Sequence, residues 1–282
     1  MKRLSLLSVL SMTILFCSCK HEDVASPVKT SAAISVAHDT CIWVKSTDVS
    51  PMVLIRSGKY IPMYGRDSAE MNVKDFMLDV YPVTNAQFLE FVKKNPQWRK
   101  SKVKKLFGDG NYLRDWKNDT TLGDEQSPQA PVTCVTWYAA NAYCACQGKR
   151  LPSVDEWEYV GMANETQQDA RKLESYTKFI LNWYEQPKGK IGNVGSTFKN
   201  YWGVYDMHGL IWEWTSDFNS VLMSDDSRKG SSDNLFCGGA SIGASDLRNY
   251  AAFMRYAFRG SLKANYSVQN LGFRCAMDIP EK

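Results

Sequence analysis

Beyond Ala163 the sequence has few helical or strand periods, and this constrains the fold more than any other feature. The region is rich in glycine, asparagine, serine and aromatic residues, and it contains no internal repeat. The whole chain has nine tryptophans and fourteen tyrosines, most of which should be buried. With 282 residues, of which 44% are hydrophobic, the chain can form one substantial core. We therefore expect one large domain with much irregular structure.

Short strands are predicted before this region. Residues 52–55 and 60–63 are expected to form strands around a turn at Ser57 and Gly58, and residues 76–80 are expected to form a third strand.

Three helices are also predicted before Ala163. The first is capped at Thr84, the second starts near Trp137, and the third starts at Ser153 with Glu156 completing a capping box. The apolar face of the first helix, at helical spacing, consists of Phe88, Phe91 and Val92.

The N-terminus is typical of an export signal. A basic start precedes an apolar run at residues 4–16, which is shorter than the roughly 20 residues of a membrane-spanning helix. Cys19 follows the small residue Ser18, as lipoprotein processing requires, whereas Cys17 follows a bulky phenylalanine. We therefore expect residues 1–18 to be a lipoprotein signal peptide and Cys19 to be acylated. Ordinary secretion with cleavage nearby is the alternative.

The chain after Cys19 predicts a tethered envelope protein. Residues 19–48 are rich in serine, threonine, alanine and valine without a helical period, so they suit a flexible tether, and the domain follows at 49–282. The charged residues 20–23 resemble the surface-export tags of Bacteroidetes lipoproteins. These features predict an outer-membrane lipoprotein of the cell envelope, with exposure at the cell surface as a further hypothesis.

The charge distribution contains one basic segment. The net charge of +4 does not by itself argue for nucleic acid as a partner. A patch between Lys93 and Lys105 could contact phosphate, sulfated glycan or an anionic membrane, although a solvated loop or helix end is the simpler interpretation. Its seven basic residues are Lys93, Lys94, Arg99, Lys100, Lys102, Lys104 and Lys105.

Six cysteines follow Cys19, and an even number in an exported protein favours disulfides. Spacing alone does not assign their pairing. They are Cys41, Cys134, Cys144, Cys146, Cys237 and Cys275.

Short motifs follow one another in a fixed order between residues 52 and 277. They are VTNAQF at 83–88, PVTCVTW at 131–137, AYC at 142–144, GKRLPS at 148–153, DEWEY at 155–159, YDMHG at 205–209, WEWTSD at 212–217, GG at 238–239 and LGFRC at 271–275. Together they resemble the sulfatase-modifying factor family, which includes the formylglycine-generating enzymes. The resemblance implies an α+β fold, similar to the C-type lectin fold, with much irregular structure.

The resemblance also implies one disulfide. The family pair maps onto Cys144 and Cys275. The pairing of the other four cysteines stays open, with Cys134 and Cys237 as one option and with Cys41 and Cys146 left over.

A calcium site of the family maps onto the side chains of Asp206 and Glu213 and the carbonyl oxygens of Gly209 and Ile211. Hard oxygen donors so close in sequence suit Ca²⁺. In the alternative, the two carboxylates bind nearby backbone N–H groups or an arginine.

The resemblance does not extend to the cysteine pair of the family enzymes. That pair binds copper just after a Gly-Gly-Ser motif, and this chain has no cysteine there before Cys275. Counted forward from the two glycines, the positions fall at Gly243 and Arg248; counted back from Cys275, they fall at Asp246 and Ala251. None of these residues is a thiolate ligand, so neither copper binding nor formylglycine synthesis is expected.

Two hypotheses of different classes follow for the function. In the first, the protein is a non-catalytic binding or scaffold lipoprotein whose partner is an envelope protein or a glycan, not nucleic acid. Its binding face precedes the GFR motif and is rich in arginine, asparagine and tyrosine, which suit recognition. The face consists of Arg248, Asn249, Tyr250, Arg255 and Tyr256. The alternative for this segment is that its Phe253, Met254 and Phe258 are simply core residues.

In the second hypothesis, the protein is an exported oxidoreductase or maturation factor that uses a different metal centre. The candidate soft-metal ligands are Cys146, Cys237, His208 and several methionines. A lone histidine is more often a hydrogen-bonded turn residue, which is the simpler interpretation of His208.

Overall fold

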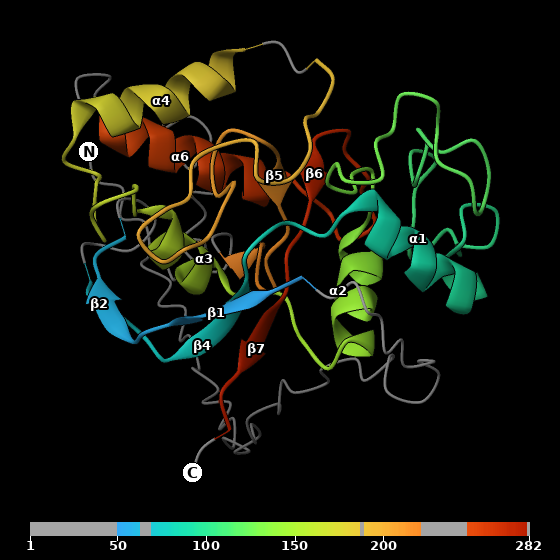
Figure 1. Ribbon diagram of the computed structural model, residues 1–282, viewed down its shortest axis with the longest axis horizontal. Coiled ribbons are helices and arrows are strands. Elements are labelled where there is room, and N and C mark those ends of the chain that lie inside the picture. Colours follow the sequence, from blue (N-terminus) through green and yellow to red (C-terminus); the bar gives the residue numbers. More distant parts are fainter. Residues whose placement is uncertain (1–49, 63–68, 187–188, 221–246, 281–282) are drawn as a thin grey trace, which may run out of the picture. The chain divides into compact units, whose positions relative to one another are not determined.

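The computed structural model describes residues 50–62, 69–186, 189–220 and 247–280, with side chains of the last range described from Tyr250 onward (Figure 1). The chain divides into the units Met1–Val36 and Ala37–Lys282, and every described residue belongs to the second unit. The predicted signal peptide, the tether and Cys19 lie outside the described residues.

A three-stranded antiparallel sheet brings the two ends of the described domain together (Figure 1). It consists of β1 (Met52–Ile55), β4 (Phe76–Asp79) and β7 (Ala276–Asp278), with β4 in the middle. Leu78 of β4 is paired with Ala276 of β7, and both are fully buried. Two of the predicted strands are therefore present, and the third strand of the sheet comes from the far end of the chain.

A separate two-stranded antiparallel sheet is formed by β2 (Gly58–Tyr60) and β3 (Met71–Val73). The expected turn at Ser57 and Gly58 is wrong, because β1 pairs with β4 and Gly58 lies inside β2. A Cβ at Gly58 would clash with the hydroxyl of Tyr159. The glycine thus marks a close approach of the strand to the helix that carries Tyr159.

The three predicted helices are α1 (Asn85–Lys94), α2 (Trp137–Cys146) and α3 (Val154–Gly161). Both α1 and α3 begin at capping boxes, in which the N-cap side chains of Thr84 and Ser153 accept the N–H of a residue that bonds back to the cap. The predicted inner face of α1 is buried, and it consists of Phe88, Phe91 and Val92.

Two helices beyond Ala163 correct the expectation of irregular structure there. They are α4 (Glu174–Glu185) and α6 (Leu247–Gly260), which lie side by side (Figure 1). The start of α4 is hard to predict because its N-cap, Leu173, offers no side-chain hydrogen bond. The inner face of α6 is hard to predict because it contains two buried arginines, which a hydrophobic pattern counts as solvent-facing.

Short elements order the rest of the domain. The strand β5 (Trp212–Glu213) pairs in parallel with β6 (Leu271–Gly272), and the 3₁₀ helix η1 (Pro96–Trp98) follows α1. Gly272 passes so close to the backbone oxygen of Val132 that a Cβ there would clash with it. No helix among the described residues is both long and apolar enough to cross a membrane.

The main core lies between α1, α2 and the strands that precede the C-terminus. The ring of Phe88 contacts those of Trp116, Tyr143 and Phe273, with centroids 6.3, 5.9 and 6.1 Å away. A second cluster packs β1 and β4 against α3. The α+β fold with much irregular structure is therefore confirmed.

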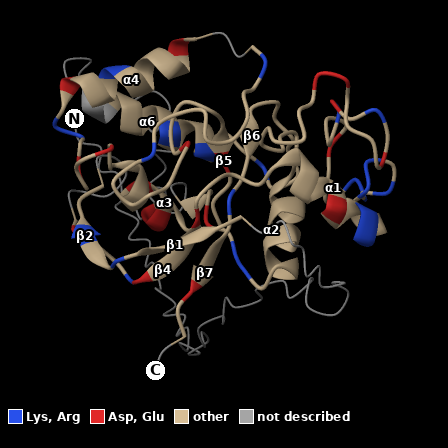
Figure 2. Ribbon diagram, in the orientation of Figure 1, with Lys and Arg blue, Asp and Glu red and all other residues tan. Residues whose placement is uncertain are grey.

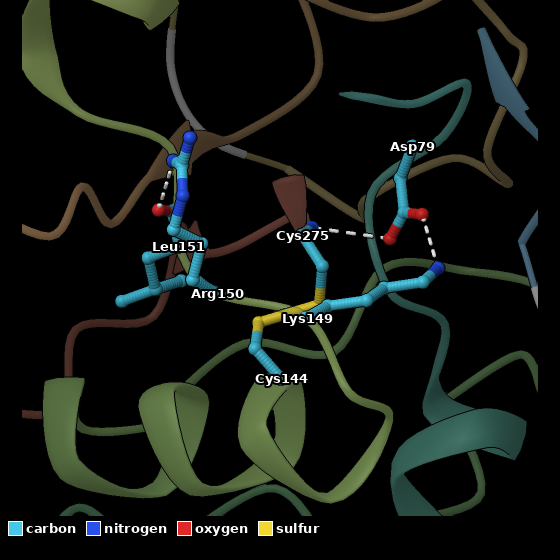
Figure 3. Close-up of a disulfide and its surroundings, with 6 residues drawn as sticks. All are labelled: Asp79, Cys144, Lys149, Arg150, Leu151 and Cys275. Carbon is cyan, nitrogen blue, oxygen red and sulfur yellow. Dashed lines mark hydrogen bonds and ion pairs between the residues drawn. A yellow bond between two sulfur atoms is a disulfide. The ribbon is translucent and has the colours of Figure 1, made fainter. Parts of the chain in front are cut away.

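The expected disulfide between Cys144 and Cys275 joins the last turn of α2 to the residue before β7 (Figure 3). Its Cα atoms are 5.7 Å apart, and the half-cystines are 131 residues apart in sequence. Beside it, the carboxylate of Asp79 accepts hydrogen bonds from Lys149 Nζ at 2.6 Å and from the backbone N–H of Cys275 at 3.1 Å (Figure 3). The disulfide and the carboxylate of Asp79 thus both hold Cys275, the residue directly before β7.

Two of the remaining cysteines are described, and both differ from what the sequence suggested. Cys134 carries a free, buried thiol, so the suggested pairing with Cys237 is wrong. Cys146 is disulfide-bonded, so it is not a free ligand. Cys41 and Cys237 themselves lie outside the described residues.

Candidate functional site

The position of the second copper-binding cysteine can be located in one of the two alignments. Ala251, in the first half of α6, is 3% exposed and packs in an apolar cluster with Tyr176, Ile180 and Leu181 of α4. The position is therefore filled by the contact between the two helices. Gly243 and Asp246 lie outside the described residues, and only the backbone of Arg248 is described.

Three side chains of the predicted binding face are described, and two of them are buried. Tyr250 is 44% exposed and stacks against Phe253, with ring centroids 6.4 Å apart. Arg255 and Tyr256 are buried, at 8% and 6% exposure, which corrects their assignment to an exposed face. They lie one helical turn after Ala251, on the side of α6 that faces the interior.

The buried side of α6 forms an ionic cluster with α3. Glu158 accepts hydrogen bonds from Arg255 Nη2 at 2.7 Å and from Arg259 Nη1 at 2.6 Å. Burial alone would raise the pKa of Glu158, but the two guanidinium groups outweigh it and lower the pKa to about 2. The guanidinium of Arg259 also lies 4.8 Å from the ring centroid of Trp157. These contacts join α6 to α3, which is a structural role.

His208 lies against the same cluster. Its Nε2 is 2.8 Å from the carbonyl oxygen of Gly161, so that nitrogen carries the hydrogen. Burial, reinforced by the positive charge of Arg255, lowers the pKa of His208 to about 3. The imidazole is therefore neutral at ordinary pH. It packs edge-on against Trp157 and Tyr176. His208 is thus a hydrogen-bonded core residue, and this corrects its candidacy as a metal ligand beside Cys146.

A small cavity between α3, α4, β5 and α6 has a volume of about 10 Å³, no more than one water needs. Aromatic rings form part of its wall: Tyr184 and Phe258 stack on Trp212, and Trp183 contacts the same ring at a tilt. This cavity therefore has no room for a substrate.

In the predicted calcium loop, both carboxylates accept hydrogen bonds from groups of the protein itself. Asp206 accepts hydrogen bonds from the backbone N–H groups of Gly195 and Thr197 and from the Thr197 hydroxyl. These bonds also hold Asp206 at a φ of 61°, a left-handed conformation that costs energy for a residue other than glycine.

Glu213, the second carboxylate, is fully buried and forms a bidentate ion pair with Arg274 at 2.8 Å. It also accepts the indole N–H of Trp157 at 2.8 Å. All four carboxylate oxygens of the loop are thus bonded, and the described residues contain no group of three or more His, Cys, Asp or Glu that could hold a metal ion. As arranged, these residues do not fit the calcium site, although calcium binding itself stays a prediction.

Cys134 is the free thiol among the described residues, and its surroundings make it unreactive. It is 1% exposed, and its Sγ lies 3.4 Å from Asp115 Oδ2. Burial and the negative charge of Asp115 raise the pKa of the thiol to about 12. The reactive thiolate form is therefore nearly absent at neutral pH.

An open recess with a volume of about 490 Å³ lies where β3, the start of α3 and the end of β7 meet. Its charged side chains are mostly acidic and already bonded: Asp155 accepts the hydroxyl of Tyr60, and Glu156 and Asp278 both accept from Arg150. Its wall consists of Asn72, Val73, Lys74, Asp75, Ser153, Asp155, Glu156, Asp278 and Ile279. Sequence analysis missed this recess because its residues come from three distant segments.

Comparison with known proteins agrees with the motif order. The family model described as the sulfatase-modifying factor enzyme 1-like domain matches residues 43–279. The inactive C-alpha-formylglycine-generating enzyme 2 of Bos taurus is 29% identical over 256 residues, which cover 75% of this chain and 81% of that protein. The formylglycine-generating enzyme of Bos taurus is 30% identical over 251 residues, which cover 72% of this chain and 66% of that protein. The structure of PvdO from Pseudomonas aeruginosa aligns over 81% of this chain and 94% of that chain, with 23% identity and a TM-score of 0.49.

Because His208 is neutral in the fold, it should make stability depend on pH. Its folded pKa is below its unfolded value of 6.5, so its contribution is complete above pH 6.5 and is lost as the pH falls toward 3. At about pH 5 the loss should be about 2 kcal/mol in the free energy of unfolding. We expect His208→Gln, which keeps an N–H for the carbonyl of Gly161, to lack this loss in urea unfolding.

The wild type and His208→Gln share every other titratable group, so the difference between their unfolding free energies at each pH reports His208 alone. Burial raises the pKa of Asp79 to about 6 against the opposing charge of Lys149, and this group changes stability in the opposite direction. Identical pH slopes for the wild type and His208→Gln would contradict the assignment of His208 as a neutral core residue.

Calcium should not stabilise the loop if its carboxylates stay on their protein donors. A calcium ion bound at about 100 times its Kd would add about 2.7 kcal/mol and raise the melting temperature by several degrees. We expect no such rise when calcium replaces EDTA in a calorimetric scan. A saturable rise that disappears in Asp206→Asn would support the calcium site that the family resemblance implies.

Proposed function

This chain belongs to the sulfatase-modifying factor enzyme 1-like (FGE-sulfatase) family, and we propose that it is a non-catalytic binding or scaffold lipoprotein of the cell envelope. It keeps the fold of the family and lacks the thiol pair on which the copper chemistry depends. Its partner is an envelope protein or a glycan. The fold alone does not determine the activity, because one fold hosts many functions.

The single observation that carries the proposal is the buried alanine that one of the two alignments places at the second copper position. Ala251 packs against α4 side chains, so at this position a substrate cysteine would find no thiolate and, among the described residues, no open surface. The free thiol of Cys134 offers no substitute because its pKa is about 12. The likeness to a mammalian relative named as inactive supports the same interpretation, since the family contains members without the activity.

The envelope location rests on the N-terminal sequence. Cys19 with Ser18 before it meets the requirement for an acylated cysteine, and the chain up to residue 48 provides a tether.

The second hypothesis, an exported oxidoreductase or maturation factor with a different metal centre, is not favoured by any observation on the described residues. Of its candidate ligands, Cys146 is in a disulfide and His208 bonds Gly161 inside the core. Cys237 lies outside the described residues.

An activity assay tests the catalytic part of the proposal. The purified chain is incubated with Cu(I), O₂ and a peptide that carries a sulfatase cysteine motif, and the peptide is then analysed by mass spectrometry. We expect no conversion of cysteine to formylglycine and substoichiometric copper or iron in the protein, with an active formylglycine-generating enzyme as the positive control. Conversion above the enzyme-free blank, or stoichiometric redox metal, would sink the proposal.

Fractionation of cells tests the anchor. We expect the wild type in the membrane fraction with a palmitate label, and Cys19→Ser without the label and released from the membrane. Cys17→Ser is the matched control, because it removes a neighbouring thiol and should leave the label in place. If Cys17→Ser loses the label and Cys19→Ser keeps it, the anchor has been assigned to the wrong cysteine.

A further inference from the structure

The end of α1 and the loop that follows it concentrate positive charge. Residues 91–108 contain seven lysines and arginines and no aspartate or glutamate. The net charge of the whole chain is only +4, so the rest of the chain is net negative. Figure 2 shows basic residues at the end of α1 and in the loop beyond it. The charge is therefore localised rather than spread over the surface.

The fold uses two of these cations to build the loop. Arg99 Nε donates to the carbonyl of Val92 at 3.2 Å, and Arg99 Nη2 donates to that of Lys93 at 2.9 Å. Lys100 Nζ donates to two carbonyls in the segment 114–116, at 2.9 and 2.7 Å. These bonds hold the loop against the last turn of α1 on one side and against the next segment on the other.

Aromatic contacts and a tight turn fix the shape of the loop. The ring of Phe107 lies 5.1 Å from that of Tyr138 and 6.1 Å from that of Trp98, centroid to centroid. The backbone N–H groups of Phe107 and Gly108 both donate to the carbonyl of Lys104, at 2.8 and 3.0 Å. The turn is thus preformed, and little ordering entropy is lost when it binds a partner.

The other lysines are left for solvent or for a partner. Lys94, Lys104 and Lys105 are exposed and form no ion pair with any residue in the described ranges. Lys102 is also exposed, and it attracts Asp119, whose carboxylate is bonded to Ser101.

Leu106 lies at the tip of the same turn, directly after two of these lysines, and is 70% exposed. A single exposed leucine is common, but this one is held outward by a braced turn that also carries two exposed lysines. A leucine that enters the acyl boundary while neighbouring ammonium groups meet anionic headgroups is the pattern of an interfacial membrane contact. A nucleic acid or sulfated glycan would use the lysines and leave Leu106 in water.

We propose that Lys94, Lys102, Lys104, Lys105 and Leu106 form a membrane-docking surface that binds anionic lipid headgroups. This inference goes beyond the proposed function and does not depend on acylation of Cys19, since the surface is part of the folded domain. In an acylated chain it would be a second contact with the membrane, beside the lipid on Cys19. It would then fix which face of the domain lies toward the bilayer.

Vesicle sedimentation with the full, non-acylated chain tests the surface. Neutral phosphatidylcholine vesicles measure background binding, including that of the N-terminal apolar run, and vesicles with about a third phosphatidylglycerol measure the charge-dependent part. We expect that part to weaken by roughly two to three orders of magnitude when Lys94, Lys102, Lys104 and Lys105 are all changed to Gln, since each lysine contributes about fivefold. We expect Leu106→Ala to weaken it by about threefold.

The matched control changes four exposed lysines elsewhere to Gln: Lys59, Lys172, Lys178 and Lys199. It has the same change in net charge, and we expect it to bind anionic vesicles nearly as the wild type does. None of the exchanged lysines of the docking surface braces the loop, so melting temperatures should stay within a few degrees of the wild type.

Equal losses in the two quadruple variants would overturn the proposal, because binding would then follow net charge alone. Heparin or duplex DNA that binds tighter than the vesicles, with Leu106→Ala unaffected, would assign the lysines to a soluble polyanion and overturn the membrane assignment. The vesicle test uses the non-acylated chain, so its result does not depend on Cys19. Failure of the anchor in cells and failure of the docking surface on vesicles are therefore distinguishable.

Discussion

The fully buried ion pair between Glu213 and Arg274 is the interaction on which the arrangement of the domain depends. It joins β5 to the segment after β6, and Arg274 also donates to the carbonyls of Asp79, Val80 and Tyr205. A domain with few regular hydrogen-bond ladders must satisfy its buried backbone carbonyls in another way. One guanidinium does so for three carbonyls, which lie in two distant segments. Removal of either partner would leave an uncompensated buried charge, at a cost of about 3–5 kcal/mol.

The family motifs persist here because most of them are parts of this interior. Trp157 donates to Glu213 and lies over Arg259, and Glu158 binds both arginines of α6. These residues hold the helices and loops in place whether or not a metal site is present. The absence of a thiol pair is therefore compatible with the fold. In one of the two alignments Ala251 falls at the second thiol position, and it packs there against α4.

The charged side chains divide into those that the fold uses for its own packing and those that remain exposed. Within one basic segment, Arg99 and Lys100 donate to backbone carbonyls, whereas Lys104 and Lys105 project from a braced turn beside Leu106. The buried carboxylate of Glu158 and the exposed lysines are both charged groups, but the first stabilises helix packing and the second can meet only solvent or a partner. The proposed docking surface thus consists of cations that the described fold does not use for its own packing.

The sequence by itself determined the family, the α+β class, the starts of α1, α2 and α3, and the disulfide that the family pattern places at Cys144 and Cys275. These features depend on short local signals or on an ordered set of motifs. Only the tertiary structure decided that α4 and α6 are helices, that Arg255 and Tyr256 point inward, and which cations remain free. The physical reason is that burial of a charge depends on its partner, and Glu158 lies 97 residues from Arg255 in the chain. Local periodicity carries no information about a partner at that distance.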